Sequence, residues 1–222
     1  MSHTPGEDPS IYPLTGGCAC GNIRYSLNTS PLVVHCCQCT SCQRETGTAY
    51  GLNAVVEGDE VTLLPSAPSA SQLQPTANFP SSMLDDWTPK KSRPGPDHGS
   101  DEPVQEIPCP VLIPVPADSG ALQYIARCPV CLTPVWSNYS GEPLIKFVRV
   151  GSLDSPALLG GPDTYIFMRS KQPFIQIAED GKPRFDAFYP QKEGVWSPAA
   201  MVRREKLLAR IMERRKEKAL DG

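Results

Sequence analysis

Cysteine is the residue type in this sequence that is best suited to chemistry, and eight of the nine cysteines fall into three short groups. The groups read CAC at 18–20, CCQCTSC at 36–42 and CPVC at 128–131. Thiolates act as nucleophiles and as ligands of zinc or iron. In a reducing compartment, cysteines at such spacings are metal ligands or catalytic thiols more often than disulfides. The sequence therefore predicts metal binding.

The first and last groups together are typical of a structural metal site. Cys18 and Cys20 form a C-x-C pair, and Cys128 and Cys131 form a C-x-x-C pair, each where a predicted strand meets a turn. Two such pairs can direct four thiolates at one ion about 2.3 Å away, which closes a tetrahedral site. Iron also binds four thiolates, but zinc is expected in a chain without another redox feature. The alternative is four buried cysteines without a metal.

The middle group predicts a different kind of site. Cys37, Cys39 and Cys42 supply three thiolates, which leave a tetrahedral ion with an open position, as in catalytic sites. Cys36 could be a fourth ligand, but strand alternation places its side chain on the opposite face from Cys37. The same alternation places His35 on the face of Cys37, where it either hydrogen-bonds to the ligand shell or is an ordinary structural histidine.

The elements that must position these cysteines are predicted to be mainly β-strands. Runs of alternating apolar and polar residues, or of β-branched residues, indicate strands at 22–27, 31–37 and 143–153. Residues 121–139 are expected to form a strand, a cysteine turn and a second strand. Residues 49–64 are expected to form a hairpin that turns at Gly58-Asp59.

Two helical segments complete the predicted domain. Residues 40–47 are expected to form one or two helical turns, with Thr40 or Ser41 as the N-cap and Gly47 as the stop. Residues 198–220 predict a basic C-terminal helix, because 201–219 have strong helical propensity and hold eight Lys or Arg against three Glu. Its apolar residues at helical spacing are Leu207, Leu208, Ile211 and Met212.

Composition divides the 222-residue chain into parts. Residues 1–13 are expected to be a disordered N-terminus, and 14–190 to form one domain. Twelve of the 25 prolines lie between Pro65 and Pro116, so 65–118 is expected to be a mostly disordered insertion in a surface loop. Cys109, within that segment, is expected to be a free surface thiol.

The overall charge excludes some classes of function. A formal net charge of −3 does not favour nucleic acid as a partner, and no run approaches the roughly 18 apolar residues that span a bilayer. The polar start, MSHTPGEDPS, lacks the apolar core of a secretory signal. We therefore expect a cytoplasmic protein, with the nucleus as the alternative, and no membrane partner.

Taken in order, the motifs GGCACGNIRYSL, HCCQCTSCQRETG and CPVC resemble the glutathione-dependent formaldehyde-activating enzyme family, which includes centromere protein V. The later segments VRVGSLD, YIFMRSKQPF and FDAFY are similar to the C-terminal part of that domain, in particular in fungal members. The resemblance covers roughly 14–64 and 119–190. Gln38 and Gln43 depart from it, since the family usually has His and Arg there.

The resemblance implies an Mss-four-like fold of antiparallel sheets with two zinc ions. The structural zinc would lie on Cys18, Cys20, Cys128 and Cys131, and the catalytic zinc on Cys37, Cys39 and Cys42. The implied activity is that of a carbon–sulfur lyase, in which glutathione adds to formaldehyde to give S-hydroxymethylglutathione.

Two functions from different classes remain open at this point. The first is a zinc enzyme that adds glutathione, or another thiol, to formaldehyde or a related electrophile. The second is a non-catalytic, zinc-stabilised interaction module that contacts a protein partner through the basic helix at 201–219. The intact three-cysteine motif favours the first function, and the basic helix favours the second.

Overall fold

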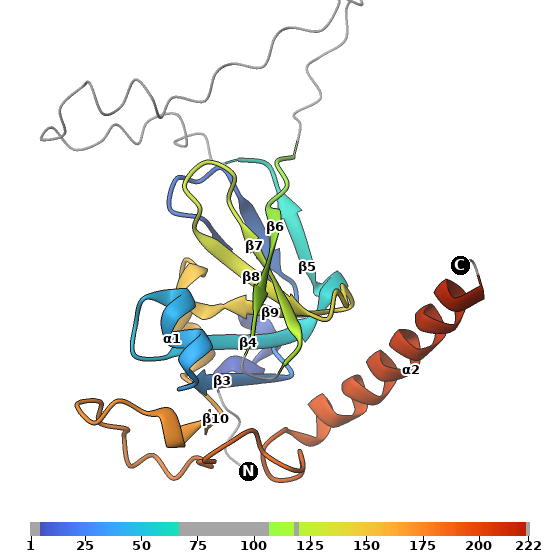
Figure 1. Ribbon diagram of the computed structural model, residues 1–222. Coiled ribbons are helices and arrows are strands. Elements are labelled where there is room, and N and C mark those ends of the chain that lie inside the picture. The colour runs from blue at the N-terminus through green and yellow to red at the C-terminus, as the bar shows by residue number, and fades with distance from the viewer. Residues whose placement is uncertain (1–4, 67–106, 118–119, 221–222) are drawn as a thin grey trace, which may run out of the picture.

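The computed structural model describes residues 5–66, 107–117 and 120–220. Within these ranges the chain folds into two β-sheets and a long C-terminal helix (Figure 1). The prediction of a mainly β fold with a C-terminal helix is confirmed. No helix in the described ranges has the length and apolar character needed to cross a bilayer.

The smaller sheet has three antiparallel strands in the order β1-β2-β5. Their bounds are Leu14–Gly17 for β1, Arg24–Leu27 for β2 and Val61–Leu64 for β5. The turn between β1 and β2 carries the first cysteine pair. This sheet therefore presents Cys18 and Cys20 at one end.

The larger sheet has seven strands in the order β10-β3-β4-β9-β8-β7-β6. Their bounds are Thr164–Ile166 (β10), Val33–Cys37 (β3), Gly51–Glu57 (β4), Ile145–Arg149 (β9), Pro134–Tyr139 (β8), Leu122–Arg127 (β7) and Val111–Pro116 (β6). The pairs are antiparallel except for β10 with β3, which run parallel. The sheets are antiparallel, as the resemblance implies, except at this edge, where a long connection returns the chain to β3 in the same direction.

The described ranges also hold two α-helices and several short 3₁₀ helices. Helix α1 spans Thr40–Thr46 and helix α2 spans Pro198–Leu220. The 3₁₀ helices are Pro5–Glu7, Pro9–Ile11, Gly58–Glu60, Val150–Ser152, Pro156–Leu159 and Met168–Ser170. Gly47 ends α1 in the left-handed conformation at φ 65°, as predicted, since glycine adopts that conformation without steric cost.

The main hydrophobic core lies between the two sheets. Tyr25 of the small sheet meets Trp136 of the large sheet edge to face, with ring centroids 6.0 Å apart. Leu27, Ala54 and Val148 are fully buried beside them. Burial of apolar surface is the dominant favourable term in folding, so this shared core holds the two sheets together.

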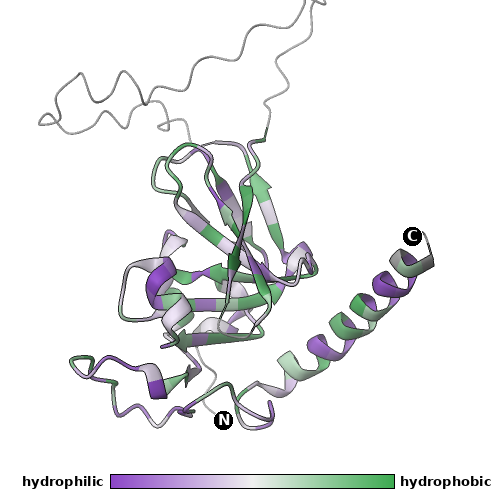
Figure 2. Cartoon of the chain, viewed as in Figure 1, coloured by the Kyte–Doolittle hydropathy of each residue, from purple (hydrophilic) through white to green (hydrophobic). Residues whose placement is uncertain are grey.

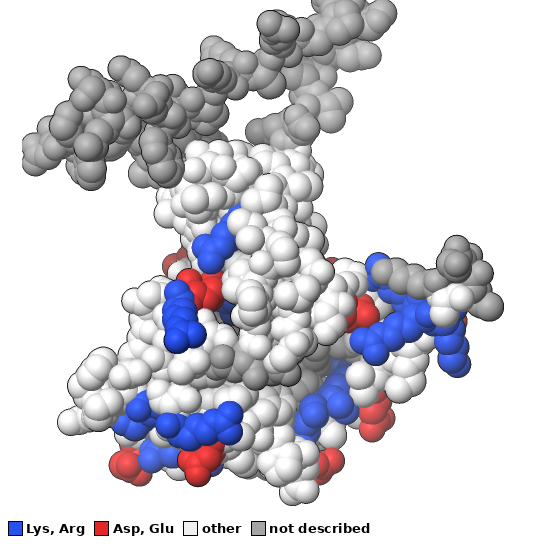
Figure 3. Space-filling model, viewed as in Figure 1, with Lys and Arg blue, Asp and Glu red and all other residues white. Residues whose placement is uncertain are grey.

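The opposite face of the large sheet packs against α2 and the segment before it. Leu207 and Ile211 of the helix are buried with Val33 and Val55 of the sheet in a second hydrophobic cluster. Figure 2 shows the matching alternation of hydrophobic and hydrophilic residues along α2. Its Lys and Arg side chains are prominent in the space-filling view (Figure 3). The helix is therefore amphipathic, and one stripe of it belongs to the domain.

Ion pairs fasten the basic face of α2 to the corner between β4 and β5. Arg203 bonds both carboxylate oxygens of Glu57, at 2.9 and 2.6 Å. Arg210 lies 2.9 Å from Asp59. Arg214 and Arg215 also lie within ion-pair distance of Glu142, so four of the eight basic residues that the sequence assigned to a contact helix are engaged within the chain.

The predicted hairpin at 49–64 is wrong. Strands β4 and β5 both form, but β4 pairs with β3 and β9, whereas β5 pairs with β2 in the other sheet. The chain turns a corner at Gly58–Glu60 and passes from one sheet to the other. A glycine turn between two strands indicates a change of direction and does not reveal which strands pair.

Two segments predicted to be disordered are partly ordered. Residues 5–13 form two 3₁₀ helices, and the Tyr12 hydroxyl donates to the Gly6 carbonyl at 2.7 Å. Residues 111–116, inside the predicted insertion at 65–118, form β6 and pair with β7. Proline is tolerated there because β6 is an edge strand. Residues 67–106 lie outside the described ranges.

The corner at Gly58 generates a stability prediction. A Cβ atom at this position would lie 2.0 Å from the Pro143 carbonyl oxygen, which is backbone and cannot rotate away. We expect Gly58→Ala to lower the free energy of unfolding by on the order of 2 kcal/mol, as overpacking does. Chemical denaturation measures this change. The control is Gly151→Ala, which meets no atom within 4 Å; equal effects of the two variants would contradict the steric argument.

Candidate metal centres

Four cysteines meet where the two sheets come together. The sulfur atoms of Cys18, Cys20, Cys128 and Cys131 all lie within 4.8 Å of one another. The Cys18–Cys20 distance is 3.5 Å and the Cys20–Cys128 distance is 3.7 Å. Sulfur atoms bound at about 2.3 Å to one tetrahedral zinc ion lie roughly 3.8 Å apart. The donor set therefore fits a closed four-thiolate site.

Backbone turns aim these sulfur atoms. In the first turn, the Ile23 N–H donates to Cys18 Sγ at 3.2 Å, and the Cys18 N–H donates to the Ile23 carbonyl at 3.0 Å. In the second turn, between β7 and β8, the Val130 N–H donates to Cys128 Sγ at 3.4 Å. Leu132 adopts a φ of 60° there. Donors aimed at sulfur favour the thiolate, which is the form that binds metal.

Burial opposes ionisation of this cluster when no cation is present. It raises the pKa of the Cys18 and Cys20 thiols above their ordinary value. Cys131 is the exception. Burial acts in the same direction on its pKa, but hydrogen bonds from Thr133 and from the Cys20 backbone outweigh burial and lower the pKa of Cys131 to about 6. Four thiolates in this space therefore need a neutralising cation, which is what a metal ion supplies.

Three further cysteines converge at the end of β3. Cys37 is the last residue of the strand, Cys39 is the N-cap of α1, and Cys42 lies in the first turn of the helix. Their sulfur atoms lie within 4.8 Å of one another, and all three side chains are buried. The Cys42 N–H donates to Cys39 Sγ at 3.3 Å, so cysteine takes the capping position predicted for Thr40 or Ser41.

The three thiols also crowd one another. Hydrogen bonds with Cys39 and Cys42, together with burial, raise the pKa of Cys37 far above its ordinary value. The hydrogen bond with Cys37 lowers the pKa of Cys42, but Cys39 and burial outweigh it and raise that pKa to about 12. This donor set fits a soft divalent cation, and it leaves a fourth position without a protein sulfur.

This three-cysteine cluster opens onto a cavity of about 530 Å³. The cavity lies between the large sheet, α1 and α2. Its wall includes all three cysteines and His35, Ser41, Asn53, Tyr139, Ser140, Glu142, Phe147, Ile166, Leu208, Met212 and Arg215. The four-cysteine cluster does not line it, so of the two clusters the one with three cysteines faces this space, which a small molecule can enter.

His35 lies in the cavity wall but bonds away from the sulfur atoms. Its Nε2 lies 2.9 Å from the Tyr189 hydroxyl, whose oxygen accepts from Trp196 Nε1 at 2.6 Å. The Tyr189 hydroxyl therefore occupies Nε2 of the imidazole and holds the ring away from the sulfur atoms. Burial, followed by the charge of Lys192, lowers the pKa of His35 to about 3 and keeps it neutral. A role of His35 beside the cysteines stays a prediction.

Three neighbours of the cluster point elsewhere. Cys36 is buried outside both clusters, and its sulfur accepts from Gln38 Nε2 at 3.2 Å. Gln43 donates to the carbonyls of Gln38 and Ser170, at 2.6 and 2.8 Å, and thereby ties α1 to the segment after β10. Neither glutamine lines the cavity. The two departures from the family pattern thus hydrogen-bond within the protein, outside the wall of this cavity.

A buried ion-pair network supports α1, and sequence reasoning missed it. Glu45 of the helix lies 3.0 Å from Arg149 and 3.3 Å from Arg127, and the Arg149 contact is an ion pair whose orientation falls short of a hydrogen bond. Arg149 also donates to Asn53, whose amide lies 3.9 Å from Cys42 Sγ. The network thus leads from the helix to the cysteines. No local pattern reveals it, because its members are far apart in sequence.

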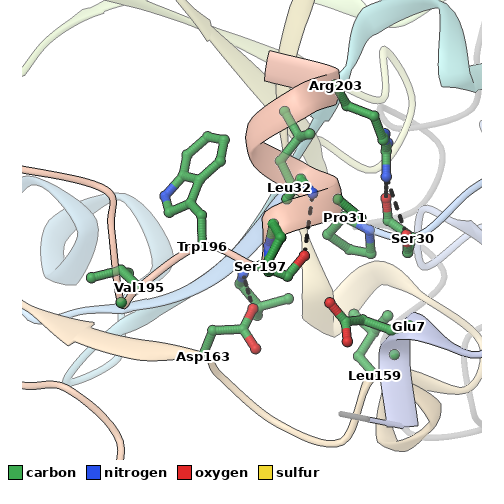
Figure 4. A pocket seen from close by; sticks show the side chains of 16 residues that line it. Glu7, Ser30, Pro31, Leu32, Leu159, Asp163, Val195, Trp196, Ser197 and Arg203 are labelled. Carbon is green, nitrogen blue, oxygen red and sulfur yellow. Dashed lines mark hydrogen bonds between the residues drawn. The ribbon is translucent and has the colours of Figure 1, made fainter. Parts of the chain in front are cut away.

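A second cavity, of about 650 Å³, lies beside the start of α2 (Figure 4). Its wall comes from four parts of the chain, near Glu7, Ser30, Asp163 and Trp196. Two of its charged residues are hydrogen-bonded to the backbone. Asp163 accepts from the Val34 N–H at 2.7 Å, and Arg203 donates to the Ser30 carbonyl at 2.8 Å. No cysteine lines this cavity.

The Glu45 network generates a second stability prediction. The Glu45 and Arg149 side chains are only 5% and 8% exposed. Removing one charge of a buried pair leaves the partner uncompensated, so we expect Glu45→Gln to lower the free energy of unfolding by about 3 kcal/mol. Glu179→Gln is the matched control, since that carboxylate pairs with Arg184 at 89% exposure and such pairs contribute less than about 1 kcal/mol. Similar losses in both variants, measured by urea unfolding, would contradict a structural role for the network.

Comparison with known families agrees with this geometry. The family model described as glutathione-dependent formaldehyde-activating enzyme matches residues 13–81. The resemblance seen in the sequence is thereby confirmed for that segment, which contains Cys18, Cys20 and the three-cysteine cluster. Cys128 and Cys131 lie outside it. No curated protein matches the chain significantly.

Proposed function

We propose that the chain is a zinc-dependent enzyme of carbon–sulfur lyase type, which adds a thiol to an aldehyde at Cys37, Cys39 and Cys42. The single observation that carries the proposal is the contrast between the two clusters. Four sulfur atoms enclose one position, whereas three sulfur atoms face a cavity of about 530 Å³. A site with three protein ligands keeps a position for a reactant.

Zinc bound by the three thiolates would supply the positive charge that holds them ionised and that acidifies a substrate thiol. In the addition, the sulfur lone pair forms a bond to the carbonyl carbon and the C=O π bond breaks. The carbonyl oxygen takes the electron pair and the proton that the thiol gave up, so the product is a hemithioacetal and no oxidant is needed. The cavity holds both reactants beside each other, which lowers the entropic cost of their meeting.

Side chains of the cavity wall supply donors for the oxygen. Burial raises the pKa of Tyr139, so its phenol stays protonated and can donate to an oxygen that gains negative charge. The ring of Tyr139 packs edge to face on Phe147, with centroids 4.9 Å apart, which orients the hydroxyl. Neutral His35 is a second polar group in the same wall, with Nε2 held by Tyr189.

The matched family's description supports glutathione and formaldehyde as the reactants. Gln38 and Gln43, which replace residues common in that family, lie outside the cavity wall and do not argue against them. A reduced thiol as substrate is in keeping with a cytoplasmic location. We propose zinc for the four-cysteine cluster as well, where it would be structural.

The alternative function, a non-catalytic interaction module, receives less support. Its contact element, the basic helix at 201–219, is engaged within the chain through Arg203 and Arg210. The same helix contributes Leu208 and Met212 to the cavity wall. A helix that completes a cavity beside three thiols favours an enzyme.

Metal analysis tests the two-site part of the proposal. We expect two zinc ions per purified chain, one for each cysteine cluster. Cys39→Ala should retain one ion, because two thiolates do not hold zinc tightly. Cys109→Ser should retain both, since Cys109 is exposed and outside the clusters. Elemental mass spectrometry gives the counts, and a single ion in the wild-type chain would rule out the two-site proposal.

Activity is tested by the exchange of formaldehyde with its glutathione adduct, followed by NMR. We expect the wild-type chain and Cys109→Ser to accelerate the exchange equally. Cys42→Ala should return it to the rate without protein, because the open site loses a ligand. If the wild-type chain gives no acceleration, formaldehyde and glutathione are not its reactants.

A further inference from the structure

The wall of the cavity beside the three-cysteine cluster is mostly apolar. Side chains of the large sheet, of the segments after β10 and of α2 contribute to it. Its larger apolar members are Ile145, Phe147, Ile166, Phe167, Phe188, Leu208, Ile211 and Met212. Such a surface attracts apolar groups from water, at roughly 25 cal/mol for each Å² buried.

Charged groups are scarce in the same wall. Glu142 and Arg215 are the charged side chains among its described residues, and Arg215 Nε lies 3.8 Å from Glu142 Oε2. The two opposite charges offset each other at one side of the cavity. Glutathione carries two carboxylates and an ammonium group, so this wall offers little to bind the whole of that molecule by charge.

The cavity is also larger than formaldehyde needs. A volume of about 530 Å³ lies in the range of small-molecule sites, roughly 300 to 1,000 Å³. Formaldehyde has one carbon atom and would contact only a small part of the wall. The large apolar surface has no partner in a reaction between formaldehyde and a polar thiol.

We propose that this cavity binds a reactant that carries an alkyl or aryl group next to its reacting atom, with that group packed against α2. The inference rests on the proposed thiol addition and names the class of its substrate. The group can belong to the aldehyde or to the thiol, since either places it beside the same hemithioacetal carbon–sulfur bond. Leu208 and Met212 then determine specificity.

Position along α2 explains why Leu208 and Met212, and not their neighbours, suit that role. Leu207 and Ile211 are buried in the core cluster, whereas Met212 is 62% exposed and still lines the cavity. Methionine is unbranched and adapts to ligands of different shape. An apolar side chain that packs only partly against its own domain has surface left for a ligand.

Binding of adduct analogues gives a test that does not depend on turnover. On the zinc-loaded full chain, calorimetry should show S-hexylglutathione binding at least about tenfold more tightly than S-methylglutathione, because the longer chain buries more apolar surface. Met212→Glu and Leu208→Glu should abolish the preference. Val202→Glu should keep it, since Val202 lies on the same helix, is 54% exposed and is outside the cavity wall. Circular dichroism checks that each variant is folded.

Two comparisons of reaction rates then identify which reactant carries the apolar group. One arm compares hexanal with formaldehyde, each with glutathione; the other compares 1-hexanethiol with glutathione, each with formaldehyde. A preference for the apolar reactant in either arm that Met212→Glu removes supports the inference and identifies the source.

The inference and the proposed function fail in different ways. Equal binding of the hexyl and methyl analogues, or a hexyl preference that survives both cavity variants, overturns the inference even if formaldehyde exchange is catalysed. Selective binding of the hexyl analogue without acceleration of any thiol addition supports the apolar class and overturns the proposed function.

Discussion

The meeting of four sulfur atoms between the two sheets is the constraint on which the rest of the domain depends. One pair comes from the turn after β1 in the small sheet, and the other from the turn between β7 and β8 in the large sheet. The core of Tyr25 and Trp136 lies between the same sheets. Buried thiolates repel one another, so this arrangement is stable only when their charge is neutralised. Hydrophobic packing and the four sulfur atoms thus meet at the same interface.

The three-cysteine cluster depends on that interface indirectly. Its sulfur atoms are placed by the end of β3 and the start of α1, and α1 is held by Glu45. Arg127, which pairs with Glu45, also donates to the Leu132 carbonyl in the second cysteine turn at 3.0 Å. One buried carboxylate therefore connects the helix of the open cluster to a turn of the closed cluster.

Local patterns in the sequence could predict the grouping of the cysteines, since knuckle spacing and strand alternation are short-range properties. Long-range features escaped prediction. The proline content of β6 resembles that of a disordered loop, and only its pairing with β7 makes it a strand. The glycine corner after β4 does not reveal that β5 joins another sheet. In the sequence alone, nothing distinguishes Glu45 and Arg149 from ordinary surface charges, because their burial follows from the fold.

The two clusters also differ in how far apart their ligands lie along the chain. Cys37, Cys39 and Cys42 fall within one strand end and one helical turn, whereas Cys20 and Cys128 are 108 positions apart. The entropy cost of closing a loop rises with its length, so the short cluster can gather its ligands during synthesis. The long cluster must wait for the second half of the chain to emerge from the ribosome. Newly made chains therefore pass through a stage in which all three thiols of the short cluster are present while the long cluster still lacks Cys128 and Cys131.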